Sequence, residues 1–216
     1  MKRLFDIVFA AAALLVLWIP MLILALAVRR SLGSPVFFRP TRAGLGSRPF
    51  QVLKFRTMTD ERGPDGELLP DDDRLTPLGR YMRRASLDEL PQFWCVLLGS
   101  MSVVGPRPLP TRYLPYYSPE QARRHLVKPG ITGWAQVNGR NSLSWEEKFR
   151  LDTWYVDHRS FWLDLKIVWK TIGIVLGRQG INAAGDAEVP SFTGSAGADG
   201  GNQSGSQKEL PAHTTG

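Results

Sequence analysis

An uninterrupted apolar stretch near the start of the chain decides how the protein folds. Residues 7–28 read IVFAAAALLVLWIPMLILALAV and contain no charged side chain. A helix of about 20 apolar residues is long enough to cross the roughly 30 Å hydrocarbon core of a bilayer. The sequence therefore predicts a membrane helix. A signal peptide is disfavoured, because the run is long and no cleavage site of small residues follows it.

Two features favour a helical hairpin that enters and leaves one leaflet. Basic pairs at residues 2–3 and 29–30 flank the run, and basic flanks mark the cytoplasmic side of a membrane helix. Pro20 lies inside the run, where it removes the hydrogen bond to the carbonyl of Val16 and kinks the helix. We therefore expect a re-entrant anchor over residues 1–30 with its membrane kink at Pro20. A kinked helix that spans the bilayer is the alternative.

The composition of the chain bounds its chemistry. Its 216 residues carry a net charge of +7 and contain 20 arginines against 7 lysines. Arginine offers a planar fork that suits phosphate, although genomic base composition explains the excess equally well. The single cysteine, Cys95, excludes an intrachain disulfide and a multi-cysteine metal site. The three histidines are scattered, so a histidine triad or zinc site has little support.

The residues after the anchor alternate as strands do. Residues 34–38 and 50–58 predict two strands joined by a basic, glycine-bearing turn, which gives a hairpin. Lys54 and Arg56 share one face of the second strand, where they either face solvent or contact phosphate. Three consecutive aspartates, residues 71–73, lack the spaced second carboxylates of a metal site and predict a solvated loop.

Helical spacing governs most of the remaining chain. Apolar spacing predicts helices near residues 75–84, 93–98, 145–155 and 161–176, and the last suits either a core or a membrane interface. The predicted fold class is therefore α+β: a re-entrant membrane hairpin, and a small, mainly helical cytosolic domain with a β-hairpin and interfacial amphipathic helices. We place the catalytic domain at residues 31–182. Residues 183–216, poor in large apolar side chains, are expected to form a largely disordered tail.

The densest chemistry lies at Ser86-Leu87-Asp88-Glu89, directly after two arginines. Locally, this spacing has the form of a capping box, with Asp88 in a first helical turn where the helix dipole favours an anion. The functional alternative makes Asp88 a nucleophile and Glu89 its helper, with arginines binding a phosphorylated substrate. The two are compatible, because a capped helix start would keep Asp88 ionised. Arg107 lies between two prolines that restrict its backbone, which favours a ligand contact.

Four segments together carry a family resemblance. Residues 54–58, 86–92, 104–108 and 128–141 resemble, in order, the bacterial sugar transferase family, the monotopic phosphoglycosyl transferases. The likeness covers about residues 2–194 and is closest to the small diacetylbacillosamine-phosphate transferases, through residues 60–62 and 66–69. One departure is Ile19-Pro20, because the family often has Ser-Pro at the membrane kink. The serine could satisfy a freed carbonyl, so its absence leaves the geometry of the break open.

The resemblance implies an activity and a cofactor. It implies transfer of a sugar 1-phosphate from a UDP-sugar to undecaprenyl phosphate with release of UMP, the first membrane step of glycoconjugate assembly. By family position Asp88 would be the nucleophile that forms a covalent phosphosugar intermediate, and also the ligand of Mg²⁺. Glu89 would assist the metal or remove a proton from the lipid phosphate. The implied location is the cytoplasmic face of the bacterial inner membrane.

The resemblance also implies binding residues and partners. The implied substrate-binding residues are Lys54, Arg56, Arg83, Arg107 and Arg140. The expected partners are the UDP-sugar, undecaprenyl phosphate, the cytoplasmic leaflet and downstream glycosyltransferases, and no nucleic acid. The alternative from a different class is a non-catalytic membrane module that binds anionic lipid or nucleotide, with the Asp88-Glu89 pair as a helix cap.

Overall fold

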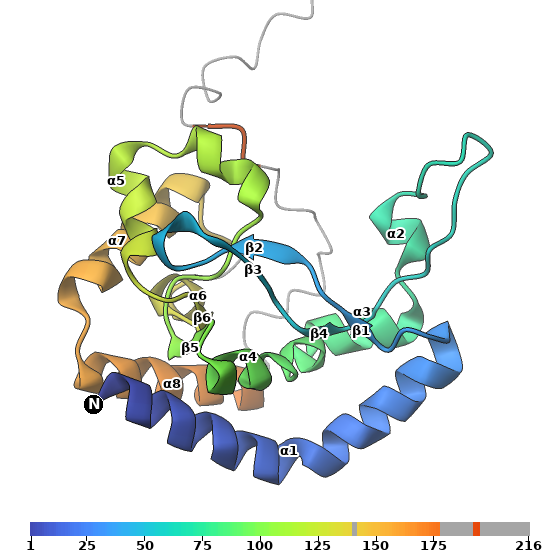
Figure 1. The fold of residues 1–216 in the computed structure, drawn as a ribbon, viewed down its shortest axis with the longest axis horizontal. Coiled ribbons are helices and arrows are strands. Elements are labelled where there is room, and N and C mark those ends of the chain that lie inside the picture. Colours follow the sequence, from blue (N-terminus) through green and yellow to red (C-terminus); the bar gives the residue numbers. More distant parts are fainter. Residues whose placement is uncertain (140–141, 178–191, 195–216) are drawn as a thin grey trace, which may run out of the picture.

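A long N-terminal helix lies along one side of a domain built from short helices and strands (Figure 1). The computed structural model describes residues 1–139, 142–177 and 192–194. The α-helices are α1 (Lys2–Leu32), α2 (Asp71–Arg74), α3 (Pro77–Arg84), α4 (Gln92–Leu98), α5 (Pro119–Ala122), α6 (Trp134–Val137), α7 (Trp145–His158) and α8 (Phe161–Gly177). The 3₁₀ turns are η1 (Leu45–Ser47), η2 (Leu87–Glu89), η3 (Thr111–Tyr116) and η4 (Arg123–Leu126). The strands are β1 (Phe37–Phe38), β2 (Thr41–Ala43), β3 (Pro49–Gln51), β4 (Lys54–Phe55), β5 (Ser102–Val104) and β6 (Gly130–Thr132).

The N-terminal helix α1 is one continuous helix with Pro20 inside it, and it is bent between its ends (Figure 1). The bend agrees with the hydrogen bond that proline removes. Among the described residues it is the one helix long and apolar enough to cross a membrane, and only 6% of its most apolar stretch is buried. A core helix of a soluble protein would be mostly buried. The predicted hairpin of two arms is not confirmed, because the helix continues through Pro20.

The N-terminal end of α1 is hydrogen-bonded to the domain through charged side chains. Asp6 is 2% exposed, and its Oδ1 accepts hydrogen bonds from Ser102 Oγ and the Val103 amide, both at 2.9 Å. Lys2 Nζ lies 2.7 Å from Asp164 Oδ2 on α8. A buried carboxylate needs such partners, so Asp6 fixes α1 against strand β5.

The C-terminal end of α1 contacts the same domain. Val28 is fully buried in a cluster with Phe55 of β4 and Met82 of α3. Arg56 Nη1 donates a hydrogen bond to the carbonyl of Leu32 at 3.3 Å, in the last turn of the helix where carbonyls lack helical partners. Both ends of α1 are therefore attached to one body.

The predicted hairpin forms, but in two pieces. Strand β2 pairs with β3 and β1 pairs with β4, both antiparallel, with Phe37 opposite Phe55 and Arg42 opposite Phe50. Between the pieces, the Val52 amide donates to the Pro40 carbonyl at 3.0 Å. Proline lacks an amide donor, which explains the gap in the ladder. The second piece delivers Lys54.

Strands β5 and β6 form a parallel pair that the sequence did not predict. Ser102 pairs with Gly130 and Val104 with Thr132. A side chain on Gly130 would place its Cβ 2.1 Å from the backbone nitrogen of Gly105, so glycine is required by the close approach of the two chains. This contact holds the turn that follows β5.

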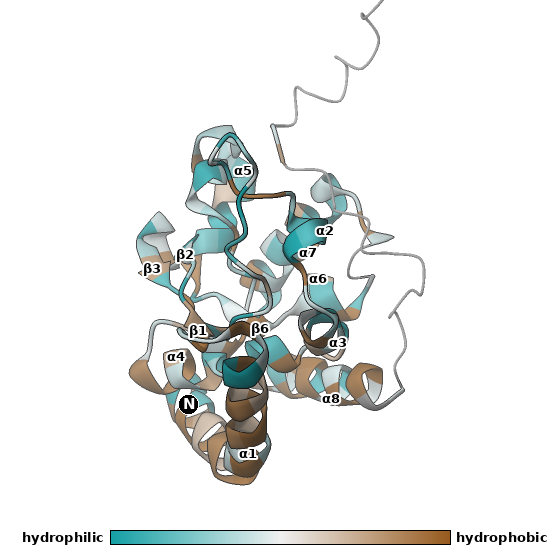
Figure 2. Cartoon of the chain, turned by 90° about the vertical axis from the view of Figure 1, so that its right-hand side faces the viewer, coloured by the Kyte–Doolittle hydropathy of each residue, from teal (hydrophilic) through white to brown (hydrophobic). Residues whose placement is uncertain are grey.

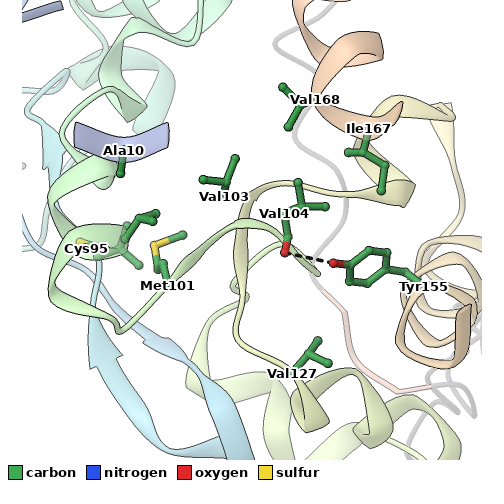
Figure 3. Close-up of a cluster of buried hydrophobic side chains, with 11 residues drawn as sticks. Ala10, Cys95, Met101, Val103, Val104, Val127, Tyr155, Ile167 and Val168 are labelled. Atoms are coloured by element: carbon green, nitrogen blue, oxygen red, sulfur yellow. Dashed lines mark hydrogen bonds between the residues drawn. The ribbon is translucent and has the colours of Figure 1, made fainter. Parts of the chain in front are cut away.

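The main hydrophobic core lies between α1, α4, α8 and the β5–β6 pair. Tyr155 is 1% exposed, and its hydroxyl donates to the carbonyl oxygen of Val104 at 3.2 Å (Figure 3). The same hydroxyl lies 2.6 Å from Asp164 Oδ1. Figure 3 also shows Ala10 of α1 and Ile167 of α8 in this cluster. The long helix is therefore part of the core and not an appendage to it.

A second cluster is aromatic and includes a residue from the predicted tail. Phe192 is 3% exposed and packs against Tyr113, Trp145 and Phe149, with ring centroids 4.9 to 5.9 Å apart. Residues 183–191 and 195–216, the rest of the predicted tail, lie outside the described residues. Residues 192–194 therefore return to the domain.

Apolar side chains gather on one side of the molecule. Figure 2 shows hydrophobic residues concentrated on α1 and α8, while the opposite side, with α2 and α5, is more polar. Trp162 and Trp169 of α8 are 75% and 76% exposed, and Leu98 of α4 is 82% exposed. Of the two alternatives predicted for α8, this exposed apolar face favours the membrane interface over the core.

Candidate active site

The Asp88-Glu89 pair lies in η2, a 3₁₀ turn between α3 and α4. Ser86, at the start of this turn, has a left-handed backbone (φ 55°), and its side chain caps no amide. Helix α4 begins only at Gln92, after Pro91. The predicted capping box is therefore wrong. The Glu89 carboxylate binds two cations from distant segments, which are stronger partners than a backbone amide.

Glu89 is held by Lys54 of β4 and by Arg107 of the turn after β5. Its Oε1 lies 2.7 Å from Lys54 Nζ and 2.6 Å from Arg107 Nη2, and its Oε2 lies 3.3 Å from Arg107 Nη1. Burial acts to raise the pKa of Glu89, but Arg107 and Lys54 outweigh it and hold that pKa well below its usual range. Glu89 is therefore a fixed anion.

Asp88 has a different environment from its neighbour. It is 7% exposed, and its Oδ2 lies 3.6 Å from Lys54 Nζ. Among the described residues, none donates a hydrogen bond to the Asp88 carboxylate. Burial raises the pKa of Asp88, Lys54 opposes this, and the charge of Glu89 adds to it. The Asp88 oxygens are thus open to a ligand.

Arg83 approaches the pair from the C-terminal end of α3. Its Nε donates to Thr57 Oγ1 at 3.1 Å, and its Nη2 lies 3.3 Å from Met58 Sδ. Its charge acts to lower the pKa of Asp88. Helix α3 is fixed at its start by Thr76, whose side chain accepts from the Gly79 amide. Of the predicted cations, Lys54 and Arg107 therefore contact the carboxylate pair, and Arg83 adds its charge from the end of α3.

A buried ion pair that sequence reasoning missed positions the backbone of Arg107. Arg124 and Asp152 are each 3% exposed, and Arg124 Nη2 lies 2.7 Å from Asp152 Oδ2. The same Nη2 donates to the carbonyl of Arg107 at 2.8 Å. No local sequence motif contains Arg124 or Asp152. The pair could have been predicted only from knowledge that both residues are buried, which the sequence does not give.

The other two predicted binding residues are not brought to the carboxylates by described contacts. Arg56 donates to Asp60 Oδ2 at 2.7 Å and to the Met58 carbonyl at 3.1 Å, besides its bond to α1. Its contacts therefore fasten α1 and the hairpin. Arg140 lies outside the described residues.

The carboxylate oxygens of Asp88 and Glu89 are the candidate ligands for the predicted Mg²⁺. Oxygen ligands suit this ion, which protein sites usually bind through one or two carboxylates together with substrate phosphates. Both oxygens of Glu89 already contact cations, whereas Asp88 has one longer ion-pair contact, from Oδ2 to Lys54 at 3.6 Å. No group of three or more potential ligands occurs within the described residues. Asp88 therefore fits an ion that arrives with a diphosphate, and the chain offers no closed cage for one.

An apolar groove runs along α1 and reaches β4 near the carboxylate pair. Its volume is about 310 Å³, and its lining includes Trp18 and Met21 of α1, Phe37, Phe55 and Trp94. Phe55 directly follows Lys54 in the chain. The site thus combines a buried carboxylate, several cations and an adjoining apolar groove. It can bind an amphiphilic phosphate and present a carboxylate oxygen to its phosphorus.

Comparison with known proteins agrees with this chemistry. A model of the bacterial sugar transferase family matches residues 1–178. The chain is 55% identical over 195 residues to an uncharacterized sugar transferase, EpsL, of Bacillus subtilis (90% of this chain, 96% of the relative). It is 48% identical to the UDP-glucose:undecaprenyl-phosphate glucose-1-phosphate transferase of Caulobacter vibrioides (81% of this chain, 69% of the relative). It is 39% identical to the UDP-galactose-lipid carrier transferase of Erwinia amylovora (83% of this chain, 41% of that longer relative).

Proposed function

The chain belongs to the bacterial sugar transferase family, and we propose that it moves a sugar 1-phosphate from a UDP-sugar to undecaprenyl phosphate, with release of UMP. The main support for this proposal is the environment of the Asp88 carboxylate. It is buried and receives no hydrogen bond from the described residues. The charges of Lys54, Arg107 and Arg83 act on it. The Caulobacter vibrioides relative is named for this reaction with UDP-glucose.

In the first step an Asp88 oxygen attacks the phosphorus that carries the sugar. The new oxygen–phosphorus bond forms as the bond to UMP breaks, and the electron pair of that bond leaves with UMP. A carboxylate and a diphosphate repel each other, so Lys54, Arg83 and Arg107 stabilise the approach by offsetting negative charge. Mg²⁺ bound with the donor would supply further neutralisation at the phosphates.

In the second step a phosphate oxygen of undecaprenyl phosphate attacks the same phosphorus. The bond to Asp88 breaks, its electron pair returns to the carboxylate, and the lipid diphosphate sugar is complete. Two such displacements divide one difficult transfer into two easier ones. We place the isoprenoid chain of the acceptor in the apolar groove along α1, which brings its phosphate toward Lys54.

The two adjacent carboxylates divide their roles in this proposal. Asp88 acts as the nucleophile because its oxygens are open. Glu89 has a lowered pKa and is therefore a weak base, which argues against proton removal from the lipid phosphate. It holds Lys54 and Arg107 in place instead.

The attachment of both ends of α1 to one domain supports a re-entrant anchor over residues 1–30. We propose that it enters the cytoplasmic leaflet of the bacterial inner membrane, with the domain on the cytoplasmic face and downstream glycosyltransferases consuming the product. Accessibility labels placed before Lys2 and after Arg30 are then both expected to report the cytoplasm. A periplasmic N-terminus would establish a spanning helix.

The test of the reaction is UMP release by the full chain in lipid nanodiscs. UDP-glucose, UDP-galactose and UDP-diacetylbacillosamine serve as donors, so that the rates of UMP release identify the sugar. Asp88→Asn is expected to abolish UMP release and the phosphosugar adduct seen by intact mass spectrometry. Asp72→Asn, on exposed α2, is the matched control and should retain both. Release retained by Asp88→Asn would exclude the covalent route. Binding of UMP without turnover of any donor would instead support the non-catalytic module.

A further inference from the structure

Three cations beside Arg107 are not used by the proposed reaction steps. They are Arg42 of β2, Arg112 of η3 and Lys148 of α7. Arg42 forms an isolated backbone bridge with Pro110, two residues before Arg112. The neighbouring Ala43 amide donates to the Leu109 carbonyl at 2.9 Å. The hairpin and the segment that carries Arg107 therefore lie against each other at this point.

Two aromatic rings bring the remaining cations to the same place. The guanidinium of Arg112 lies 5.4 Å from the ring centroid of Tyr113, and Lys148 Nζ lies 4.8 Å from that of Trp145. The two rings contact each other edge to face at 5.7 Å. Cation–π contacts of this kind orient a charged side chain without neutralising it. The cations are thus positioned but keep their charge available.

The charge of this cluster is not balanced by carboxylates. Across the described residues, no ion pair joins a carboxylate to Arg42, Arg112 or Lys148. Burial lowers the pKa of Arg42, and the nearby charges of Arg107 and Arg112 lower it further. Burial and Arg107 likewise lower the pKa of Lys148. Like charges held together in this way repel each other, and a bound anion would relieve the repulsion.

A cavity between the hairpin and the Arg107 segment contains a polar atom without a partner. His125 is 6% exposed and lines this cavity together with Gly44, Pro106 and Arg107. Its Nδ1 lies 3.2 Å from Ser47 Oγ, whereas its Nε2 is buried with no hydrogen-bond partner among the described residues. The cavity measures about 10 Å³, room for about one water molecule, so a water and not the nucleoside is the expected partner of Nε2.

We propose that Arg42, Arg112 and Lys148 bind the phosphate of the nucleoside monophosphate part of the donor. This inference rests on the proposed function. When the bond to the sugar-bearing phosphorus breaks, its electron pair stays on the departing UMP oxygen, and that oxygen gains negative charge. Cations placed there stabilise the leaving group. Lys54, Arg83 and Arg107 then stabilise the phosphate that is transferred. The second set of three cations stabilises the phosphate that leaves with UMP.

The test uses the full chain in nanodiscs and the variants Arg42→Gln, Arg112→Gln and Lys148→Gln. Exposed arginines nearby give matched controls: Arg48→Gln, in the turn between β2 and β3, and Arg150→Gln on α7. UMP affinity is measured by calorimetry, and KM by UMP release. Each variant is expected to weaken UMP binding and raise the KM for the UDP-sugar about tenfold, the typical effect of a lost hydrogen bond to a charged group. The KM for undecaprenyl phosphate and both controls should not change.

The outcomes separate this inference from the proposed function. Unchanged UMP affinity in all three variants, with wild-type turnover intact, would overturn the inference alone. A rise confined to the KM of undecaprenyl phosphate would also overturn it, by assigning these cations to the acceptor phosphate. Loss of UMP affinity in the three variants, in a protein that turns over no donor, would support the nucleotide site and reject the reaction. Equal thermal unfolding of variants and controls ensures that a loss of binding reflects the site.

Discussion

Glu89 contacts the guanidinium of Arg107 through both of its carboxylate oxygens, at 2.6 and 3.3 Å. Adjacent Asp88 receives no hydrogen bond from the described residues and lies 3.6 Å from its nearest charged partner, Lys54. Neighbours in sequence thus have opposite environments. One carboxylate organises cations, and the other is left open to react.

Replacement of Glu89 by Gln tests whether this residue positions cations or removes a proton. We expect kcat/KM to fall by about tenfold to a hundredfold, because one positioned cation can supply that much stabilisation. A positioning role slows the release of UMP itself in a single turnover without acceptor. A role as base would leave a full, fast UMP burst and block only transfer to the lipid. A normal burst in Glu89→Gln would therefore contradict the positioning role.

The pH dependence of the first step should report Asp88. The nucleophile must be ionised, so activity falls as the pH is lowered through its pKa, and burial moves that pKa above the ordinary aspartate value of 3.8. Lys54 acts to lower the same pKa, so Lys54→Gln should shift the acid limb to higher pH. Single-turnover UMP release without acceptor excludes titration of the lipid phosphate. An acid limb that Lys54→Gln leaves in place would contradict this assignment.

Asp6 should contribute to stability out of proportion to its position near the terminus. Asp6→Ala leaves the Ser102 hydroxyl and the Val103 amide buried without an acceptor, so it is expected to cost about 2 kcal/mol of unfolding free energy. Asp6→Asn keeps one acceptor oxygen and should cost less. Chemical unfolding in detergent measures both. Equal losses in the two variants would show that charge, and not hydrogen bonding, holds α1 to β5.

His125 makes stability depend on pH in the acid range. Burial, assisted by Arg124, lowers the pKa of His125 to about 4 from the usual 6.5. The unfolded chain therefore takes up a proton below pH 6.5 that the folded chain refuses, and stability falls as the pH drops from about 6.5 to about 4, by up to about 3 kcal/mol. His125→Gln should remove this component of the slope. His158→Asn, at an exposed position, should not. A slope unchanged by His125→Gln would refute the buried neutral histidine.

Phe192 should connect residues 192–194 to nucleotide binding. Phe192→Ala vacates a buried aromatic site, which typically costs about 3 kcal/mol. The rings of Tyr113 and Trp145 that contact Phe192 also orient Arg112 and Lys148. UMP affinity is therefore expected to weaken along with stability. Leu45→Ala, at an exposed site, is the control. Stability and affinity equal to those of the control would show that Phe192 is not packed there in solution.

The sequence predicts the parts of the fold that depend on local patterns. The apolar run gives α1, alternation gives the hairpin, and apolar spacing followed by Gly99 gives α4. The parallel pairing of Ser102 with Gly130 is not predictable in this way, because three-residue strands are too short for alternation to show.

In the candidate site, too, local patterns predict some features, and others depend on tertiary packing. Adjacent carboxylates after arginines predicted Asp88 as the nucleophile, which stays a prediction. Local spacing misassigned Ser86 as a cap, because the partners of Glu89 lie 35 and 18 residues away in the sequence. The buried Arg124–Asp152 pair behind Arg107 depends on tertiary packing alone. Arg56 shares a strand with Lys54, yet the end of α1 draws it into hydrogen bonds away from the carboxylates.

The attachment of both ends of α1 to one domain also bears on how the protein responds to its lipid surroundings. A spanning helix adapts to bilayer thickness by tilting, which relieves hydrophobic mismatch. A helix fixed to a single body at Asp6 and at Leu32 cannot tilt independently of that body. Its depth is then set by the fold, so the active site should stay at a constant height above the acyl chains as bilayer thickness varies.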